Sequence, residues 1–440
     1  MADYSFHFVL GFCLACYFLA QWLVSKDKLN VTNPTFKRFQ RDYLFVYSLV
    51  IMSDWLQGPY LYELYSFYQY DENRIAALYV AGFGSSAVFG TFTGSFADRF
   101  GRKRLALVFC VMYSLSCFTK RFSSYALLMT GRVLGGISTS LLFSVFESWY
   151  IHEHVHTFDY PGEWMADTFS KSTLLNGVVA VSAGLLSHVV AETFHFGPVS
   201  PFFVAIVFLV IAGVVISAMW TENYGADNDK AVEPSTNCLE SLVHIVQHPH
   251  ILLIGVMQSL FESCMYIFVF LWTPVLKPIH PPLGIIFASF MVAVMIGSSI
   301  FDHLFNAGQS AARILQTSFI LMFSSLAISS VFIHRPFICF FAFLLLEIGC
   351  GLYFPAIGYL RGQHVPEEYR SAIMNWFRVP LNLAVAAVLL LMFGSQSSSR
   401  TIFVLCAGMS GIGILCSTLF SRRYPNDKKS SPGTEIFESV

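Results

Sequence analysis

Long apolar segments recur along the whole chain and are separated by short polar stretches. Thirteen of them approach the roughly 20 residues that an α-helix needs to cross a bilayer. They cover residues 5–24, 41–66, 74–97, 104–120, 125–150, 168–191 and 199–220, and then 251–275, 283–303, 313–333, 336–360, 370–393 and 400–421. The pattern predicts an all-α membrane protein that crosses the bilayer many times.

One polar stretch, residues 221–249, is much longer than the others. It leaves six apolar segments on each side and one extra segment at the N-terminus. Two six-helix halves joined by a cytoplasmic linker are typical of repeat-built transporters. We therefore expect five parts: an extra transmembrane helix with its cytoplasmic loop (1–40), an N-terminal half (41–220), a cytoplasmic linker (221–249), a C-terminal half (250–424) and a disordered cytoplasmic tail (425–440).

The composition supports this interpretation. Hydrophobic residues make up 55% of the 440 residues and charged residues only 12%, whereas about a quarter of a soluble domain is charged. So few charges cannot cover the whole exterior, and the lipid bilayer must therefore solvate much of it. The formal net charge of −1 gives no reason to expect a nucleic acid as a partner.

The sequence contains no nucleotide-binding loop and no nucleophile motif. Cys13 and Cys16 form a C-x-x-C pair inside a predicted membrane helix, but no second pair lies nearby, so we expect buried thiols there. The segment 152–156, HEHVH, lacks the H-E-x-x-H spacing, and we expect it to be solvated or to contact head groups. We therefore expect no enzyme, no cofactor and no bound metal.

The basic residues predict the orientation in the membrane. If the loop after the first apolar segment is cytoplasmic, eighteen Lys and Arg residues lie inside and six lie outside. Lys and Arg concentrate in cytoplasmic loops of membrane proteins. The excess predicts an extracellular N-terminus and a cytoplasmic C-terminus.

The most specific local pattern is the segment 94–104, GSFADRFGRKR, between the third and fourth apolar segments. Gly94 lets a neighbouring helix approach closely, Asp98 ends a helix, Gly101 makes the turn, and the basic run from Arg102 stays at the cytoplasmic head groups. The string resembles the loop between helices two and three of the major facilitator superfamily, in which the acid latches one half against the other. The resemblance implies a gating role for Asp98 and Arg102. It also makes the second apolar segment helix one of twelve.

Two arginines fall inside predicted membrane helices, where a charge is costly unless it is paired or faces a wet cavity. Arg132 resembles the helix-four arginine of the superfamily, but a structural salt bridge or a snorkelling side chain would also explain it. Arg378 lies about two turns inside helix eleven, and Pro380 frees a backbone carbonyl there. With Asn375 and Trp376, Arg378 forms the best candidate for binding an anion.

Four acids also fall inside predicted membrane helices: Asp54, Glu147, Glu262 and Glu347. Asp54 and Glu262 lie in helices one and seven, which are equivalent in the repeat, so the two carboxyl groups could face each other across a central cavity. Gln57 and Tyr60 lie within two turns of Asp54 and are candidate substrate ligands. We predict that the acids serve proton coupling or gating. A permanent ion pair with one of the membrane arginines is the alternative.

Several strings together resemble one branch of the superfamily, the molybdate-anion transporter family. They are residues 54–62 (DWLQGPYLY), 131–154 (GRVLGGISTSLLFSVFESWYIHEH), 268–274 (FVFLWTP), 282–287 (PLGIIF), 351–355 (GLYFP) and 375–381 (NWFRVPL). The resemblance implies uptake of molybdate by a multi-pass protein of the plasma membrane. It covers nearly the whole chain except the linker and the tail. No molybdate motif can be read from the residues themselves, so the substrate depends on the resemblance alone.

Molybdate is a tetrahedral dianion, and its transfer into a membrane cavity requires cationic and neutral hydrogen-bond donors. Candidate donors are Arg132, Arg378, Asn375, Trp376 and Gln57. Two other interpretations remain open: a membrane sensor or scaffold that transports nothing, and a transporter of another small solute such as a cationic drug or a sugar. The charged residues in the membrane favour transport, because a scaffold need not bear their cost. We expect the transporter to be a monomer.

Overall fold

The computed structural model describes residues 2–23, 33–90, 92–224, 234–366, 369–394 and 399–424, and the regular elements in these ranges are all helices. Each of the thirteen predicted segments corresponds to one helix or to a pair of consecutive helices. The all-α prediction is therefore confirmed for the described residues. The predicted tail lies outside them.

The first ten α-helices are α1 (Ala2–Leu23), α2 (Pro34–Trp55), α3 (Leu61–Phe67), α4 (Glu72–Gly90), α5 (Thr93–Phe100), α6 (Arg102–Thr119), α7 (Tyr125–Leu142), α8 (Val145–His152), α9 (Gly162–His188) and α10 (Ser200–Met219). The others are α11 (Pro234–Gln247), α12 (Pro249–Leu276), α13 (Leu283–Asn306), α14 (Ala311–Val331), α15 (Pro336–His364), α16 (Arg370–Gly394) and α17 (Ser399–Arg423). Short π-helical turns extend α8 over Glu153–Thr157 and α9 over Val189–Thr193.

Eight of the described helices are long and apolar enough by themselves to cross a membrane, and two shorter apolar helices span Ser5–Leu19 and Ile373–Leu389. The predicted segment 41–66 is divided into α2 and α3 by a turn over residues 56–60. Pro59 lies in this turn and has no backbone N–H to continue a helix. The segment 125–150 is likewise divided, at Phe143 and Ser144, into α7 and α8.

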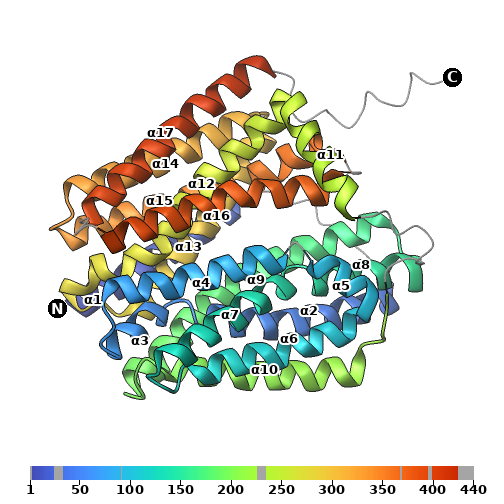
Figure 1. Ribbon diagram of the computed structural model, residues 1–440, viewed down its shortest axis with the longest axis horizontal. Coiled ribbons are helices and arrows are strands. Elements are labelled where there is room, and N and C mark those ends of the chain that lie inside the picture. The colour runs from blue at the N-terminus through green and yellow to red at the C-terminus, as the bar shows by residue number, and fades with distance from the viewer. Residues whose placement is uncertain are drawn as a thin grey trace.

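The helices form two bundles, with α2 to α10 in the lower one and α12 to α17 in the upper one (Figure 1). The bundles meet where α9 packs on α13 and where α4 packs on α16. Gly184 of α9 and Gly284 of α13 make the first crossing so close that a Cβ atom on Gly284 would overlap the Gly184 carbonyl oxygen. Larger side chains at these positions would separate the two halves.

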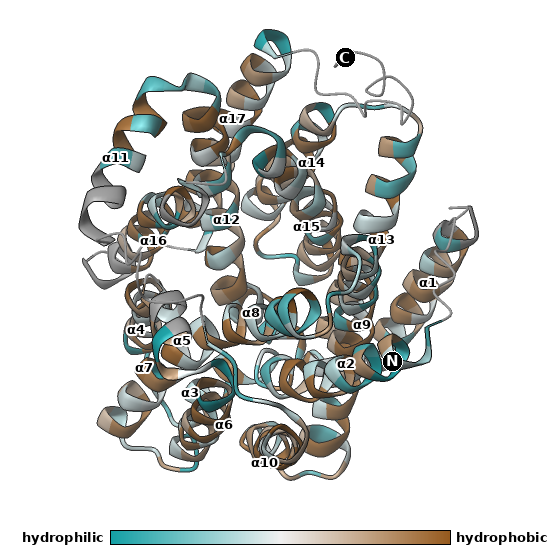
Figure 2. Ribbon diagram, turned by 90° about the vertical axis from the view of Figure 1, so that its right-hand side faces the viewer, coloured by the Kyte–Doolittle hydropathy of each residue, from teal (hydrophilic) through white to brown (hydrophobic). Residues whose placement is uncertain are grey.

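Helix α1 stands outside the two bundles, beside α13 and α9 (Figure 2). The Phe6 ring contacts the rings of Phe337 and Phe340 of α15, with centroids 5.6 and 5.2 Å apart. The Gln21 side-chain amide donates a hydrogen bond to the Ser299 hydroxyl of α13 at 2.8 Å. The extra helix therefore attaches mainly to the C-terminal half, although it precedes the N-terminal half in the sequence.

Helix α11 lies within the stretch interpreted from the sequence only as a polar linker. It packs against α12 and α16, and Leu242 and Ile245 face the groove between them. Three-residue spacing puts these two side chains on one face of a helix. The surrounding residues are polar, so the sequence pattern alone does not indicate this helix.

Candidate functional site

A polar cluster lies inside the C-terminal half. The Tyr353 hydroxyl of α15 donates a hydrogen bond to Glu262 Oε1 of α12 at 3.0 Å. One turn away, Arg361 Nη1 donates to Gln258 Oε1 at 3.3 Å. The charges of Arg361 and Arg378 both act on the Glu262 carboxylate. Two guanidinium groups and one carboxylate therefore share this site.

Arg378 extends from α16 toward the opposite half. A Cβ atom on Gly90 of α4 would lie 3.4 Å from Arg378 Nη1, so the guanidinium group lies where α16 crosses α4. Asn375 and Asn382 share the helix face of Arg378, because they are three and four residues away. The Asn382 amide donates to the Arg378 carbonyl oxygen at 2.7 Å. The face that carries Arg378 is thus polar over two turns.

Trp376, which the sequence grouped with Arg378, lies on a different face of α16. It lines an apolar groove of about 500 Å³ between α11, α12 and α16, together with Pro380. Ser259 and Ser263 of α12 donate hydrogen bonds to the carbonyl oxygens of Phe377 and Leu381, at 2.9 and 3.3 Å. Such hydroxyl donors help a membrane helix to tolerate an internal proline.

Asp54 approaches the same region from the N-terminal half. Its carboxylate accepts a hydrogen bond from the Tyr113 hydroxyl of α6, and within the described part of the chain it forms no ion pair. Tyr266 of α12 interacts electrostatically with Asp54, Glu262 and Arg378. The two acids from equivalent helices therefore both lie near one tyrosine.

Arg132 contacts a neighbouring helix. Its Nε atom donates to the Leu78 carbonyl oxygen of α4 at 3.0 Å, and the guanidinium carbon lies 5.2 Å from the centre of the Tyr79 ring. A Cβ atom on Gly82 would overlap the Arg132 guanidinium group. These contacts fasten α7 to α4, and the anion-binding role of Arg132 stays a prediction.

Tyr60 belongs to a second polar site, at the end of the bundle opposite the loop 98–104. This site surrounds a cavity of about 280 Å³ that both halves line. The Tyr60 hydroxyl donates to Glu192 Oε1 at 2.5 Å, and the Leu283 backbone N–H donates to the same oxygen at 3.2 Å. Lys277 Nζ lies 4.0 Å from Glu63 Oε2 and 2.5 Å from Ser66 Oγ.

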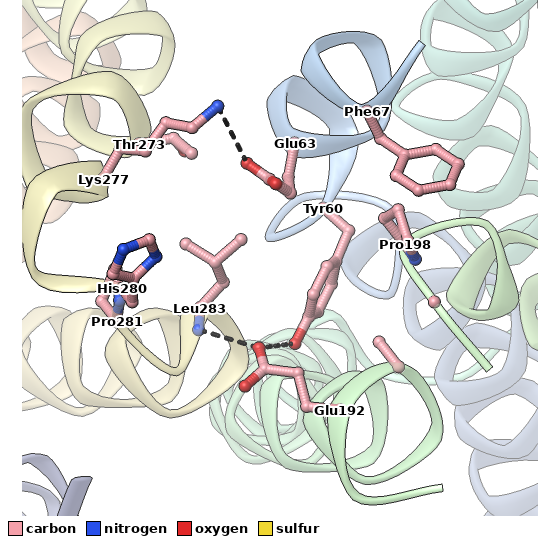
Figure 3. A pocket seen from close by; sticks show the side chains of 12 residues that line it. Tyr60, Glu63, Phe67, Glu192, Pro198, Thr273, Lys277, His280, Pro281 and Leu283 are labelled. Atoms are coloured by element: carbon pink, nitrogen blue, oxygen red, sulfur yellow. Dashed lines mark hydrogen bonds and ion pairs between the residues drawn. The ribbon is translucent and has the colours of Figure 1, made fainter. Parts of the chain in front are cut away.

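Glu192 and Glu63 come from the N-terminal half, whereas Leu283 and Lys277 come from the C-terminal half (Figure 3). Ser66, on α3, also belongs to the N-terminal half. These contacts close this end of the bundle. Aromatic packing supports the closure, because Phe270 of α12 contacts the rings of Tyr62 and Tyr79. Gln57, the other predicted ligand beside Asp54, is buried and donates to the Ser53 carbonyl oxygen at 3.1 Å.

The two remaining acids lie elsewhere. Glu147 lies on α8, is exposed, and interacts with Tyr43 and Tyr47 of α2. Glu347 is buried in the C-terminal bundle beside Cys350. The structure therefore brings Asp54, Glu262, Asn375 and Arg378 to one region, while Glu147 and Glu347 lie apart from it.

The loop 98–104 has the predicted turn at Gly101, whose φ of +96° favours glycine. Glu222, just after α10, was missed in the sequence. Its carboxylate accepts hydrogen bonds from the backbone N–H groups of Lys103 and Arg104 at 2.9 and 3.2 Å. The Arg102 N–H donates to the Asn223 carbonyl oxygen at 2.9 Å. The Asp98 side chain is outside the described residues, so its gating role stays a prediction.

Replacement of Glu222 by alanine should lower the free energy of unfolding by about 1–3 kcal/mol, because the first N–H groups of α6 lose their charged acceptor. Thermal unfolding of the purified protein in detergent measures this effect. Glu222→Gln keeps one carbonyl acceptor and should lie between the alanine variant and the parent. An unchanged midpoint in Glu222→Ala would show that water replaces the carboxylate at no cost.

The segment 152–156 is more buried than its composition suggested. His154 is fully buried, and its ring nitrogens lie 3.2 Å from the Tyr150 hydroxyl and 3.0 Å from the Pro161 carbonyl oxygen. Glu153 accepts a hydrogen bond from Asn223 at 2.8 Å. The expectation of a solvated cluster is wrong for these two residues. Among the described residues, no group of three or more His, Cys, Asp or Glu side chains could hold a metal ion.

Two bundles of six membrane segments, with charged side chains where the bundles meet, form an architecture typical of secondary transporters. Solved structures support this fold. A mutant form of the nucleoside transporter NupG matches with a TM-score of 0.70 and 9% identity, covering 87% of this chain and 99% of that one. A D-xylose-proton symporter matches with a TM-score of 0.65 and 11% identity, covering 88% and 97%. At these identities the likeness shows the fold alone.

Sequence comparisons resolve the family. Residues 5–345 match the family model described as sugar transporters with 12 transmembrane segments, and residues 279–440 match that of the Major Facilitator Superfamily. The molybdate-anion transporter of Xenopus laevis is 41% identical over 407 residues, which cover 90% of this chain and 89% of that protein. The one of Danio rerio is 40% identical over 446 residues, covering 92% of each. The chain belongs to the molybdate-anion transporter family of the major facilitator superfamily, a family of transporters and not of enzymes.

Proposed function

We propose that this protein takes up molybdate across the plasma membrane by alternating access of its two halves, as a monomer. The observation that carries the proposal is the identity of about 40%, over about nine-tenths of the chain, to relatives named molybdate-anion transporters. The cluster around Glu262 supports it, because Arg361 and Arg378 together carry two positive charges, which match the two negative charges of molybdate. Asn375 and Gln258 add neutral amides for the remaining oxygens.

Uptake of labelled molybdate into cells that express the chain tests the proposal, with sulfate, tungstate and glucose as competitors. We expect uptake above that of cells without the chain, with competition by tungstate and none by glucose. Surface expression without uptake would favour a sensor or scaffold. Uptake of glucose would favour the sugars named in the description of the matching family model.

We further propose that the N-terminus is extracellular and the C-terminus cytoplasmic, which the charge asymmetry of the loops supports. Epitope tags at each end provide the measurement. In unpermeabilised cells only the N-terminal tag should bind antibody, and permeabilisation should expose the C-terminal tag. Antibody binding to the C-terminal tag alone in intact cells would reverse the orientation.

In this orientation the cavity around Tyr60, Glu192 and Lys277 lies at the extracellular end, and its contacts form an extracellular gate. Outward opening must break the Glu192–Leu283 hydrogen bond and the contacts of Lys277 with Glu63 and Ser66. Each of these joins the two halves. We propose that they stabilise the conformation in which the substrate site is closed to the extracellular side.

Replacement of Glu192 by alanine should therefore shift the protein toward outward-open conformations. Thr273 is buried in the wall of this cavity and is replaced by cysteine in both the parent and the Glu192→Ala variant. The cysteine in the Glu192→Ala variant should react with an extracellular, membrane-impermeant maleimide several-fold faster than the one in the parent. Glu192→Gln is the matched control, because its amide oxygen still accepts from Tyr60 and Leu283. Equal reactivity in the parent and in Glu192→Ala would exclude the carboxylate from the gate.

A further inference from the structure

A polar pocket of about 370 Å³ lies on the outer side of the C-terminal half, between the first turn of α14 and the last turn of α17. Arg313 and Arg422 line it, together with side chains that carry amide or hydroxyl groups. The Gln316 side-chain amide donates a hydrogen bond to the Thr418 hydroxyl at 2.8 Å, which joins the two helices at the pocket. Loop charges and the proposed topology place this end of the bundle in the cytoplasm.

The two arginines are available for a ligand. Both are exposed, and within the part of the chain that the structure describes neither forms an ion pair with a carboxylate. They come from segments more than a hundred residues apart, so their convergence on one pocket is a property of the fold. The preference for cytoplasmic basic residues explains their presence on this side. It does not explain why they line a hollow together with neutral hydrogen-bonding groups.

An apolar surface continues from this pocket toward the middle of the membrane. Ile320 and Phe323 lie seven residues beyond Arg313 and Gln316 and so share their face of α14. Leu415 precedes Arg422 by seven residues on α17. The three apolar side chains are 44%, 39% and 69% exposed. A polar pocket at the membrane surface thus adjoins an apolar strip at the depth of acyl chains.

The equivalent place in the N-terminal half differs. There α6 and α10 also begin and end at the cytoplasmic side, but the chain itself engages their basic residues. Lys103 Nζ donates to the carbonyl oxygens of Ser217 and Trp220 at 3.0 and 2.7 Å, and Arg104 Nε lies 3.7 Å from Glu222 Oε2. The groove between these two helices is lined mainly by apolar side chains. In the N-terminal half, backbone carbonyl oxygens and one carboxylate of the chain itself therefore bind the basic residues at this place.

We propose that the pocket between α14 and α17 binds the phosphate-bearing head group of an anionic phospholipid in the cytoplasmic leaflet. Guanidinium groups pair with phosphate oxygens through two parallel hydrogen bonds. Basic pockets between membrane helices on the cytoplasmic side suit such head groups. The amide and hydroxyl groups complement head-group hydroxyls, and the acyl chains lie along Ile320, Phe323 and Leu415. The apolar strip favours a lipid over free phosphate as the ligand, because free phosphate has no acyl chain to contact it.

The test uses the full-length protein, purified in detergent and depleted of lipid, and monitors its thermal unfolding during titration. The probes are dioctanoyl phosphatidylinositol bisphosphate, dioctanoyl phosphatidylserine, dioctanoyl phosphatidylcholine and inorganic phosphate. We expect the bisphosphate lipid to stabilise the protein at the lowest concentration, phosphatidylserine at a higher one, and phosphatidylcholine not at all. In the double variant Arg313→Gln/Arg422→Gln the half-saturating concentration should rise about 30-fold, on the scale of two basic residues at a membrane surface.

The double variant Arg121→Gln/Arg335→Gln is the matched control, because it removes two exposed arginines at the opposite end of the bundle. It should bind the bisphosphate lipid like the parent. Equal binding by the Arg313→Gln/Arg422→Gln variant, or equal stabilisation by phosphatidylcholine, would overturn the proposal. Stabilisation by inorganic phosphate at the same concentration as the lipid would replace it with a site for the free ion. The inference depends on the proposed orientation but not on the substrate, so these outcomes are separate from those of the uptake test.

Discussion

Replacement of Arg378 by alanine should abolish molybdate uptake while the amount of protein at the cell surface stays that of the parent. Arg378 lies where α16 crosses α4, and its charge, like that of Arg361, acts on the Glu262 carboxylate. Arg378 is exposed, and loss of its charged hydrogen bonds to the anion should cost about 1.5–3 kcal/mol. This corresponds to a decrease in affinity of about 10- to 150-fold.

Arg378→Lys should recover part of the uptake, because lysine keeps the charge but lacks the planar arrangement for two parallel bonds to oxygens. Arg121→Ala, at an exposed loop position, is the control for a general loss of positive charge and should behave like the parent. Parent-like uptake in Arg378→Ala would assign this arginine a structural role.

Arg132→Ala provides an informative contrast. Because its contacts in the structure are to Leu78 and Tyr79, we expect less folded protein, with little change in the concentration that half-saturates uptake. A large increase in that concentration would instead support the anion-binding role predicted from the sequence. Comparison of the two alanine variants thus tests whether each arginine within the membrane binds the anion or stabilises the packing of helices.

The sequence predicted the helices well because the bilayer imposes a length and a composition on every segment that crosses it. It also singled out Asp54, Glu262 and Arg378 as candidates, because a charge within such a segment is conspicuous, and their roles stay predictions. It did not reveal Arg361, which was assigned to the cytoplasmic loops, because helix α15 continues to His364, four residues past the end of the apolar segment. The position of a charge along a helix depends on where the helix ends, and apolar periodicity locates that end poorly.

Side-chain direction was the second limit. Asn375, Trp376 and Arg378 are close in sequence, yet α16 directs Trp376 into the groove beside α11. Adjacent residues on a helix differ in direction by about 100°, so a string of residues does not define a site. The proposed gate residues Glu192 and Lys277 were not predicted from the sequence, since each lies at the edge of an apolar segment, where charged residues are ordinary. Only the contacts between the two halves give them a role.

Uptake should become faster as the external pH falls, and Glu262→Gln should remove most of this dependence. Inward movement of a dianion against a negative-inside potential costs about 4.6 kcal/mol per 100 mV, since each charge contributes about 2.3 kcal/mol. Two accompanying protons would cancel this cost. The site suggests a way to couple protons to the anion, because the charges of Arg361 and Arg378 both act on the Glu262 carboxylate.

Protonation of Glu262 would remove the negative charge that acts on both guanidinium groups, so their positive charge would be available to molybdate. It would also remove the repulsion between the carboxylate and the anion. Glu262→Gln imitates the protonated form, so it should keep the affinity at neutral pH and retain only the weak pH dependence that Asp54 contributes. Asp54, whose hydrogen bond comes from the neutral Tyr113 hydroxyl, is the proposed second carrier, and Asp54→Asn should weaken the pH dependence.

Glu163→Gln, at the exposed start of α9, is the control and should keep the profile of the parent. A flat profile in the parent, together with no effect of a proton uncoupler, would exclude proton coupling. The alternative, in which both acids stay ionised throughout the cycle, predicts that Glu262→Gln loses uptake at every pH, because Arg361 and Arg378 would lose the carboxylate that balances them.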